Sequence, residues 1–323
     1  MERRDVLKLG ALAATKVLLG QSSVEAMMSK HDVYRNFDGK IPKRKLGKTG
    51  VELSIIGMGG LALAGTEQEK ANTIVADAIA SGINYFDVAP SYADAQQRLC
   101  PALKPFRDNS FLACKSTMRD KAGLERELNE SLKALETDHF DLYQLHAIKD
   151  VEKDVKAVFA KDGAMEAIIK AKKEGKLKYI GFTAHSAEAA LAAMHAFEFD
   201  TIMYPINFAC HFRNGFENEV LAEAKKQNMG ILAIKAMAQQ QWPKGAEKKY
   251  KNCWYEPIED AGLARLALSW SLSQGITSAL PPADEKLFRL AIELAPQCKP
   301  LNNDELAILR QRADQANPLF PLG

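Results

Sequence analysis

The chain has 323 residues, of which 47% are hydrophobic and 26% are charged, a composition typical of a globular protein with a sizeable core. The formal net charge is +2, and no stripe of Lys and Arg is interleaved with aromatic residues, so nucleic-acid binding has little support. The five cysteines are odd in number and include no Cys-x-x-Cys pair, which argues against a disulfide framework, a zinc ribbon or an iron–sulfur cluster, and we predict no metal site.

The N-terminal segment has the pattern of an export signal. Arg3 and Arg4 precede an x-hydrophobic-Leu-Lys motif and a mostly apolar stretch, which resembles a bacterial twin-arginine (Tat) signal. Lys16 interrupts the apolar stretch, so we expect no stable membrane span. This interpretation predicts that residues 1–40 are a signal and leader, that the Tat export machinery is a partner, and that the protein is periplasmic or otherwise exported. The alternative is an ordinary amphipathic helix on a cytoplasmic protein.

Residues 41–323 repeat one pattern and are expected to form a single domain. Each short apolar run typical of a buried strand precedes a segment with the three- and four-residue apolar spacing of a helix. The eight runs are 53–57, 83–87, 110–115, 140–146, 177–183, 200–207, 229–235 and 276–281. Buried strands that alternate with helices predict a parallel sheet covered on both faces. Eight such units fit an α/β fold of the (β/α)8 TIM-barrel type, with a doubly wound sheet as the alternative.

Two motifs lie near the start of this domain. The segment KRKLGKTGVELS is expected to form a β-hairpin that closes the bottom of the barrel. The segment 57–62, GMGGLA, satisfies the G-x-G-x-x-G/A fingerprint of dinucleotide-binding Rossmann folds, and Asp87 ends the next strand. That fingerprint requires a helix that begins at the glycines. Thr66 as N-cap and Glu69 as its capping-box partner predict a later start, so we interpret the match as coincidental.

Polar side chains follow several of the predicted strands at their C-terminal ends, where the active sites of (β/α)8 barrels lie. In chain order they are Asp87 and Tyr92, Lys115, His146, Thr183 and His185, Asn207, and Lys235. Ionisable groups packed together perturb one another's pKa values, a feature of active sites.

Four of these residues can carry proton transfer. An ammonium at Lys115 would lower the pKa of the Tyr92 phenol, and Asp87 would keep that lysine charged and in place. His146 could donate a hydrogen bond to the oxygen that the phenol protonates. The set predicts a general acid beside a hydrogen-bond donor for a carbonyl oxygen, which protonates a carbonyl as hydride arrives or runs the reverse.

The same residues resemble the aldo-keto reductase superfamily. The order Asp-x4-Tyr, a strand-end lysine and DLYQLH is similar to that family, and the likeness extends from RKLGKTGVELSIIGMGG to ALSWSLSQGITSALP. The resemblance implies an NAD(P)(H)-dependent oxidoreductase that reduces an aldehyde or ketone, or oxidises the alcohol. It implies that Tyr92 is the general acid/base, that Lys115 and Asp87 tune it, and that His146 orients a small-molecule carbonyl substrate.

The positions that match the family's cofactor contacts depart from its usual residues. The resemblance assigns these contacts to Gly59, Thr183, Ala184, His185, Met203, Ile234, Lys235 and Lys286. Ala184 stands where the family commonly has an asparagine that binds the carboxamide, and Ile234 replaces the tyrosine that stacks on the nicotinamide. Lys286 and Arg289 are the candidates for a 2′-phosphate contact, and family habit favours NADP (NADPH) over NAD.

These departures keep a second function open, namely a cofactor-binding redox-sensing or regulatory barrel with slow turnover. Substrate specificity would come from the segments 147–163 and 236–258. The second segment carries Trp242, Trp254 and Tyr255. These aromatic residues either form a pocket wall for a sugar or a ring, or pack the loop against the barrel.

Overall fold

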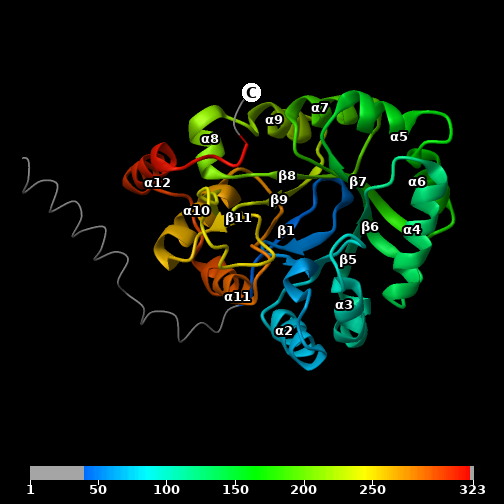
Figure 1. Cartoon of the computed structure of the whole chain (residues 1–323), viewed down its shortest axis with the longest axis horizontal. Coiled ribbons are helices and arrows are strands. Elements are labelled where there is room, and N and C mark those ends of the chain that lie inside the picture. The colour runs from blue at the N-terminus through cyan, green and yellow to red at the C-terminus, as the bar shows by residue number, and fades with distance from the viewer. Residues whose placement is uncertain (1–39, 321–323) are drawn as a thin grey trace, which may run out of the picture.

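The computed structural model describes residues 40–320. The predicted twin-arginine motif and its apolar stretch lie outside the described residues and stay a prediction. Within residues 40–320, no helix combines the length and the apolar character needed to cross a membrane. Figure 1 shows the described part as a set of strands surrounded by helices.

Eight parallel strands form the centre of the molecule. They are β3 (Met58–Gly59), β4 (Tyr85–Asp87), β5 (Phe111–Ser116), β6 (Phe140–Ile148), β7 (Leu177–Ala184), β8 (Thr201–Pro205), β9 (Gly230–Ile234) and β12 (Ser278–Leu280). They pair in the order β12-β9-β8-β7-β6-β5-β4-β3. A parallel bridge between Ile56 and Ala279 links the two ends of this order, and the Gly57 amide donates to the Ala279 carbonyl at 3.0 Å. The closed arrangement confirms the predicted (β/α)8 barrel.

Helices cover the outside of the barrel (Figure 1). The α-helices are α2 (Gln68–Ala80), α3 (Ala95–Leu103), α4 (Lys121–Ala134), α5 (Ala157–Phe159), α6 (Ala164–Lys173), α7 (Ala187–Ala196), α8 (Phe208–Asn214), α9 (Asn218–Lys226), α10 (Ala261–Ser273), α11 (Glu285–Leu294) and α12 (Asn303–Gln315). Short 3-10 or π turns are η2 (Gly47–Thr49), η3 (Gly60–Leu63), η4 (Lys104–Asn109), η5 (Val151–Lys156) and η6 (Ala295–Gln297). Asp120, Asp260 and Asp284 cap α4, α10 and α11, because each carboxylate accepts a first-turn amide.

The predicted hairpin is present as β1 (Lys43–Lys45) paired antiparallel with β2 (Glu52–Ser54). Its fully buried Leu46 and Leu53 pack inside the barrel at the N-terminal end of the strands. The predicted strand 53–57 was placed too early, since the barrel strand begins at Met58. Ser54 explains the difference: its amide donates to Asn84 Oδ1 at 2.8 Å and its hydroxyl to the Ile56 carbonyl at 2.7 Å, which ends the hairpin there.

The start of α2 corrects a second expectation. Glu67, not Thr66, precedes the helix, and no side chain caps it. The Thr66 hydroxyl instead donates to the Leu63 carbonyl at 2.7 Å. The glycines at 57–60 lead into η3 rather than into a long helix, so a Rossmann-type phosphate site does not form there.

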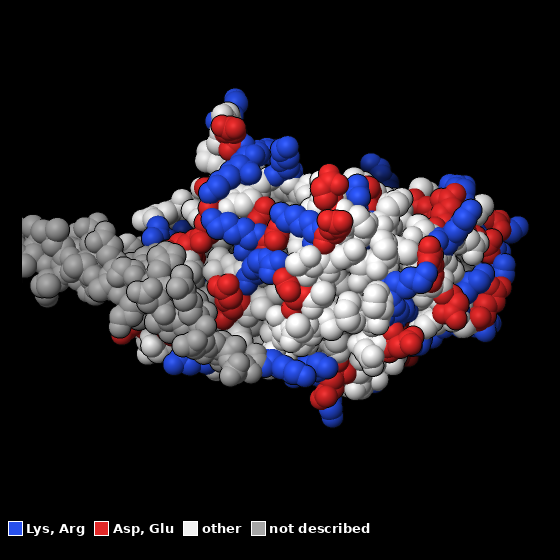
Figure 2. All heavy atoms as spheres, turned by 90° about the horizontal axis from the view of Figure 1, so that it is seen from below, with Lys and Arg blue, Asp and Glu red and all other residues white. Residues whose placement is uncertain are grey.

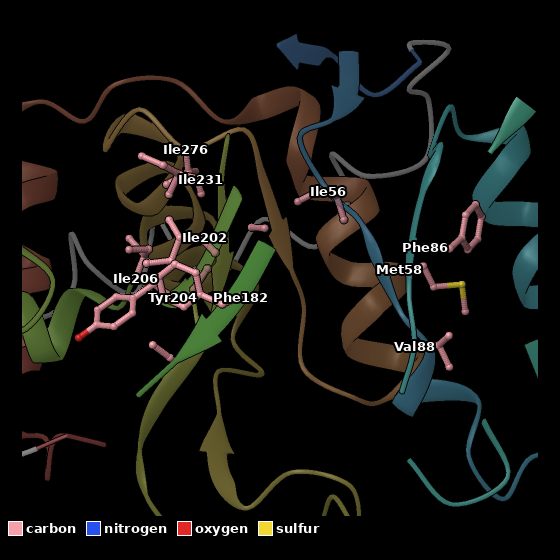
Figure 3. Close-up of a cluster of buried hydrophobic side chains, with 14 of the residues drawn as sticks. Ile56, Met58, Phe86, Val88, Phe182, Ile202, Tyr204, Ile206, Ile231 and Ile276 are labelled. Carbon is pink, nitrogen blue, oxygen red and sulfur yellow. The ribbon is translucent and has the colours of Figure 1, made fainter. Parts of the chain in front are cut away.

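Side chains along each strand alternate between the inside of the barrel and the outer layer beneath the helices. Figure 3 shows part of the outer layer, where Phe182, Ile202 and Ile231 extend from the adjacent strands β7, β8 and β9. The inner layer contains Leu46, Leu53, Tyr85, Phe111, Ala113, Leu142, Met203, Leu232 and Leu280. This alternation decides which strand residues reach the interior.

Charged side chains are mixed over the surface. On the face in Figure 2, Lys and Arg are interspersed with Asp and Glu. Many pairs are exposed, such as Lys170 with Glu125 at 3.1 Å. Pairs of this kind contribute about 0–1 kcal/mol each, so the fold is stabilised chiefly by its two apolar layers.

Candidate active site

A cavity of about 220 Å³ opens at the C-terminal ends of the barrel strands. Its lining consists of Gly59, Leu61, Asp87, Tyr92, Lys115, His146, Thr183, His185, Met203, Ile234, Lys235, Asn252, Trp254, Tyr255, Leu280, Pro281 and Ala283. It therefore brings together the four predicted proton-transfer residues and six of the eight predicted cofactor residues. Within residues 40–320, no group of three or more His, Cys, Asp and Glu side chains is placed to hold a metal ion.

Strand alternation explains why these side chains meet. Tyr85 belongs to the inner layer and Phe86 to the outer layer, so Asp87 faces inward again. Lys115 lies two residues after the inward Ala113, and it is paired in register with Gln144 of the next strand. The parallel register thus places these side chains at one end of the barrel interior.

The centre of the cavity floor is a buried ion pair. Lys115 Nζ donates to Asp87 Oδ1, and both side chains are only 1% exposed. The other carboxylate oxygen, Oδ2, accepts from Gln144 Nε2 at 3.1 Å and from the Tyr85 hydroxyl at 3.3 Å. Burial alone would lower the pKa of Lys115, but the interactions with Asp87 and Tyr92 together outweigh burial, and the pKa is raised. Lys115 is therefore a fixed cation.

Gln144 and Tyr85 were not predicted as site residues. Each lies two positions before a predicted one on the same strand, Gln144 before His146 and Tyr85 before Asp87. The two-residue period was the signal that could have identified them.

Tyr92 lies in the loop between β4 and α3 and is partly exposed to the cavity. Lys115 Nζ is 5.2 Å from the centroid of its ring, and the ring of His146 is 5.9 Å away, nearly perpendicular at 86°. Burial raises the pKa of the Tyr92 phenol, while the Lys115 charge acts in the opposite direction and only partly offsets it. Lys115 lowers the pKa of Tyr92 as expected, but burial raises this pKa by more. The phenol therefore keeps its proton at neutral pH.

His146 is a neutral imidazole in this cavity. Burial lowers its pKa to about 2, and the positive charge of Lys115 contributes. No residue among 40–320 forms a hydrogen bond with its buried Nδ1 atom. A neutral ring can donate one hydrogen bond without carrying charge.

A β-bulge aims His146 into the cavity. The pairing of β6 with β7 shifts register between Leu145 and Ile148, and Ala147 has a positive φ of 58°. The Thr183 hydroxyl accepts the Ala147 amide at 2.7 Å, and Arg119 Nη2 donates to the His146 carbonyl at 2.7 Å. Bulges beside active sites redirect side chains in this way. Thr183 and Arg119 therefore hold the His146 backbone.

Two predicted cofactor residues lie outside the cavity lining. Ala184 is fully buried in the outer layer, because it follows the inward Thr183 on the strand. Lys286 lies in the first turn of α11 with a side chain that is 74% exposed, and its Nζ is 4.0 Å from Glu259. A contact between Lys286 and an adenosine phosphate stays a prediction.

The long loop after β9 supplies an aromatic wall. Its strand β10 (Ala238–Gln241) pairs with β11 (Tyr255–Pro257), and Trp254 and Tyr255 line the cavity. Lys235 Nζ lies 4.6 Å from the Tyr255 ring centroid and 5.2 Å from that of Trp254. Trp242 instead packs the loop, since its Nε1 donates to the Cys253 carbonyl at 2.9 Å. Trp254 and Tyr255 therefore lie at the cavity while Trp242 packs the loop, and a role of the first two in ligand binding stays a prediction.

Two sequence relatives are similar to part of the chain. The chain is 34% identical over 155 residues to Uncharacterized oxidoreductase YqkF of Bacillus subtilis (strain 168), which covers 44% of this chain and 48% of the relative. It is 31% identical over 212 residues to Aldo-keto reductase YhdN of the same organism, covering 57% and 58%. These matches thus span about half of each relative's length.

Solved structures share the fold. The holo form of aldo-keto reductase AKR11C1 from Bacillus halodurans superposes with a TM-score of 0.68 at 22% identity, covering 86% of this chain and 98% of that one. A thermostable aldo-keto reductase, Tm1743, gives a TM-score of 0.65 at 19% identity, covering 84% and 100%. The Aldo/keto reductase family profile matches residues 55–285, which include Asp87, Tyr92, Lys115 and His146. The chain belongs to the aldo/keto reductase family of oxidoreductases.

Proposed function

We propose that the protein is an NAD(P)(H)-dependent oxidoreductase that reduces an aldehyde or ketone, or oxidises the corresponding alcohol, with Tyr92 as general acid/base. The observation that carries this proposal is the shared cavity of Tyr92, His146 and the buried Lys115–Asp87 pair. Family membership supports the same reaction class.

The cavity residues fit a nicotinamide ring. A Cβ built on Gly59 would meet no atom within 4 Å, so the glycine leaves the cavity open at that wall. Met203, Ile234 and Leu280 offer an apolar surface, and the buried Nδ1 of His185 has no partner among residues 40–320. Gly59, Thr183, His185, Met203 and Ile234 would hold the ring. When bound in its reduced form, the nicotinamide supplies hydride to the carbonyl carbon.

The protein's own residues handle the proton and the oxygen. Neutral His146 donates a hydrogen bond to the carbonyl oxygen and orients it toward Tyr92. The Tyr92 hydroxyl gives its proton to that oxygen as negative charge develops there. The adjacent Lys115 ammonium stabilises the phenolate that remains, and Asp87, gripped by Gln144 and Tyr85, prevents the lysine from moving.

The proposal is tested by cofactor binding and turnover together. Fluorescence titration with NADPH and with NADH measures the two dissociation constants, and a panel of aldehydes and ketones measures reduction of the carbonyl. Binding of NADPH, tighter than that of NADH, together with turnover supports the proposal. Absence of binding of both cofactors would overturn it.

A second function is motivated by Ile234, which lies at the cavity where the family usually has a stacking tyrosine. Without a stacking contact the nicotinamide ring is positioned less firmly. This is compatible with a redox-sensing or regulatory barrel that binds cofactor and turns over slowly. The two functions differ in rate. Fast reduction of any member of the carbonyl panel refutes the regulatory function, whereas tight cofactor binding without turnover supports it.

Export by the twin-arginine route is a separate proposal, based on Arg3, Arg4 and the apolar stretch that follows. Because a periplasm provides no free NADPH, an exported enzyme would retain its cofactor or receive electrons from a partner. Cell fractionation of an Arg3→Lys/Arg4→Lys variant tests the route. A distribution unaffected by the double change rejects it.

A further inference from the structure

Lys235 gives the cavity a positive charge that no acidic side chain among residues 40–320 pairs with. Among the residues that the structure describes, Asp87 is the only carboxylate that lines the cavity, and it is bound to Lys115. Lys235 lines the same cavity, and within residues 40–320 no carboxylate lies within 4.0 Å of its Nζ. Burial lowers the pKa of Lys235 to about 8, which leaves the ammonium charged in most molecules at neutral pH.

The protein holds this ammonium in a defined place. The rings of Trp254 and Tyr255 lie within cation–π distance of Nζ, which partly replaces the lost hydration. Lys235 also has a positive φ of 68°, a conformation that costs a non-glycine residue about 1–3 kcal/mol. Strained backbone persists where the surrounding structure requires it and is concentrated at functional sites. Here it places Lys235 at the end of β9, facing the cavity.

We propose that Lys235 is a specificity-determining residue that binds a carboxylate on the substrate, so that the protein acts on aldehydes or ketones that are also acids. This inference rests on the proposed function and names its substrate class. A substrate carboxylate would form an ion pair with the Lys235 ammonium. Such charge-assisted contacts are among the stronger polar interactions in a partly buried site.

The cavity favours the substrate, rather than a cofactor phosphate, as the source of the anion. Tyr92 and His146 line the same small cavity as Lys235, so a molecule whose carbonyl reaches them lies beside the ammonium. Lys235 also lies close enough to His185 for its charge to lower the pKa of that imidazole. In a dinucleotide, by contrast, the ribose separates the nicotinamide from the phosphates. The flat faces of Trp254 and Tyr255 beside the ammonium suit a substrate with a ring.

The test uses two aldehydes, 4-carboxybenzaldehyde and methyl 4-formylbenzoate, in which a carboxylate is replaced by its uncharged methyl ester. The ratio of their kcat/KM values is measured for the wild type and for Lys235→Met, Lys235→Arg and Lys248→Met. Lys248 is a matched control, since it is exposed in the same loop and forms no ion pair within residues 40–320. Calorimetric titration with the two alcohol products gives a readout that does not depend on turnover, and NADPH titration monitors the cofactor site.

We expect Lys235→Met to lower the ratio of kcat/KM for the acid to kcat/KM for the ester by about 10- to 100-fold, mainly through the KM of the acid. Lys235→Arg should retain most of the preference for the acid over the ester. Lys248→Met should have the same acid-to-ester ratio of kcat/KM as the wild type. An unchanged acid-to-ester ratio would overturn the inference, as would an equal loss on both aldehydes accompanied by weaker NADPH binding. If the wild type reduces neither aldehyde but binds the acid product through Lys235, the anion site stands and the proposed reaction fails.

Discussion

Lys115 and Asp87 come from the neighbouring strands β5 and β4 and form an ion pair that is almost completely removed from solvent. The pair has no exposed edge at which water could replace either partner. Gln144 and Tyr85 occupy the second carboxylate oxygen, so the acid cannot rotate away from the lysine. The charge beside Tyr92 is therefore fixed before any ligand enters.

Breaking this pair should destabilise the fold. Lys115→Met leaves Asp87 buried without a counter-charge, and we expect the free energy of unfolding to fall by about 3–5 kcal/mol. Urea denaturation measures this loss. The double variant Lys115→Met/Asp87→Asn should recover part of it, because neither charge remains. A single-variant loss below about 1 kcal/mol would show that the pair is better hydrated than its burial indicates.

Thr183 should control the orientation of the His146 side chain. In Thr183→Val the Ala147 amide loses its acceptor, at a cost of about 1–3 kcal/mol, and the bulge that carries His146 relaxes. We expect kcat to fall, and because Thr183 is also among the residues proposed to hold the nicotinamide ring, the NADPH dissociation constant should rise as well. Thr183→Ser, which keeps the hydroxyl, provides the control. A Val variant with the kcat of the Ser variant would contradict this positioning role.

The two cavity imidazoles should make the protein sensitive to acid. Burial lowers the pKa of His146 to about 2 and that of His185 to about 4, below the unfolded value near 6.5. The unfolded chain then binds more protons, so stability declines as pH falls through about 6.5. Urea denaturation between about pH 7 and 5 should show a shallower decline in His146→Gln/His185→Gln. The free energy of unfolding of the exposed control His195→Gln should decline with falling pH as that of the wild type does. A decline in the double variant as steep as in the wild type would show that the two imidazoles do not cause the acid sensitivity.

The N-terminal hairpin should matter for stability more than for chemistry. Leu46 is fully buried inside the barrel against Gly230, where even an added methyl would lie 2.4 Å from the leucine Cδ1. Leu46→Ala should therefore cost about 2–5 kcal/mol in denaturation experiments. Turnover of the folded variant should be nearly normal. Val51→Ala, at a partly exposed position, is the control. An equal loss of the free energy of unfolding in both variants would show that Leu46 does not fill the end of the barrel.

Part of this site could be predicted from strand ends alone. Asp87, Lys115 and His146 are titratable residues at the ends of apolar strands, and parallel strands of a barrel bring such ends together. Gln144 and Tyr85 could not be predicted in this way, because an amide or a tyrosine inside an apolar strand does not by itself indicate a site residue. Their role is visible only when the register places them beside the carboxylate.

Other features depend on contacts between distant segments. Ala184 and His185 were expected to share a role, but successive side chains alternate at the end of β7, so Ala184 faces the helices and His185 the cavity. Trp254 reaches the cavity because β10 pairs with β11, a pairing that no local pattern specifies. The net pKa of Tyr92 likewise depends on how deeply the ring is buried, which residue types alone do not determine.

The most direct test of the account replaces the proposed proton donor. Tyr92→Phe removes one oxygen and keeps the ring that packs beside His146. In this variant we expect single-turnover oxidation of bound NADPH by an aldehyde to slow by about 10²–10⁴-fold, with the NADPH dissociation constant nearly unchanged. Oxidation at the wild-type rate by Tyr92→Phe would contradict the assignment of Tyr92 as general acid.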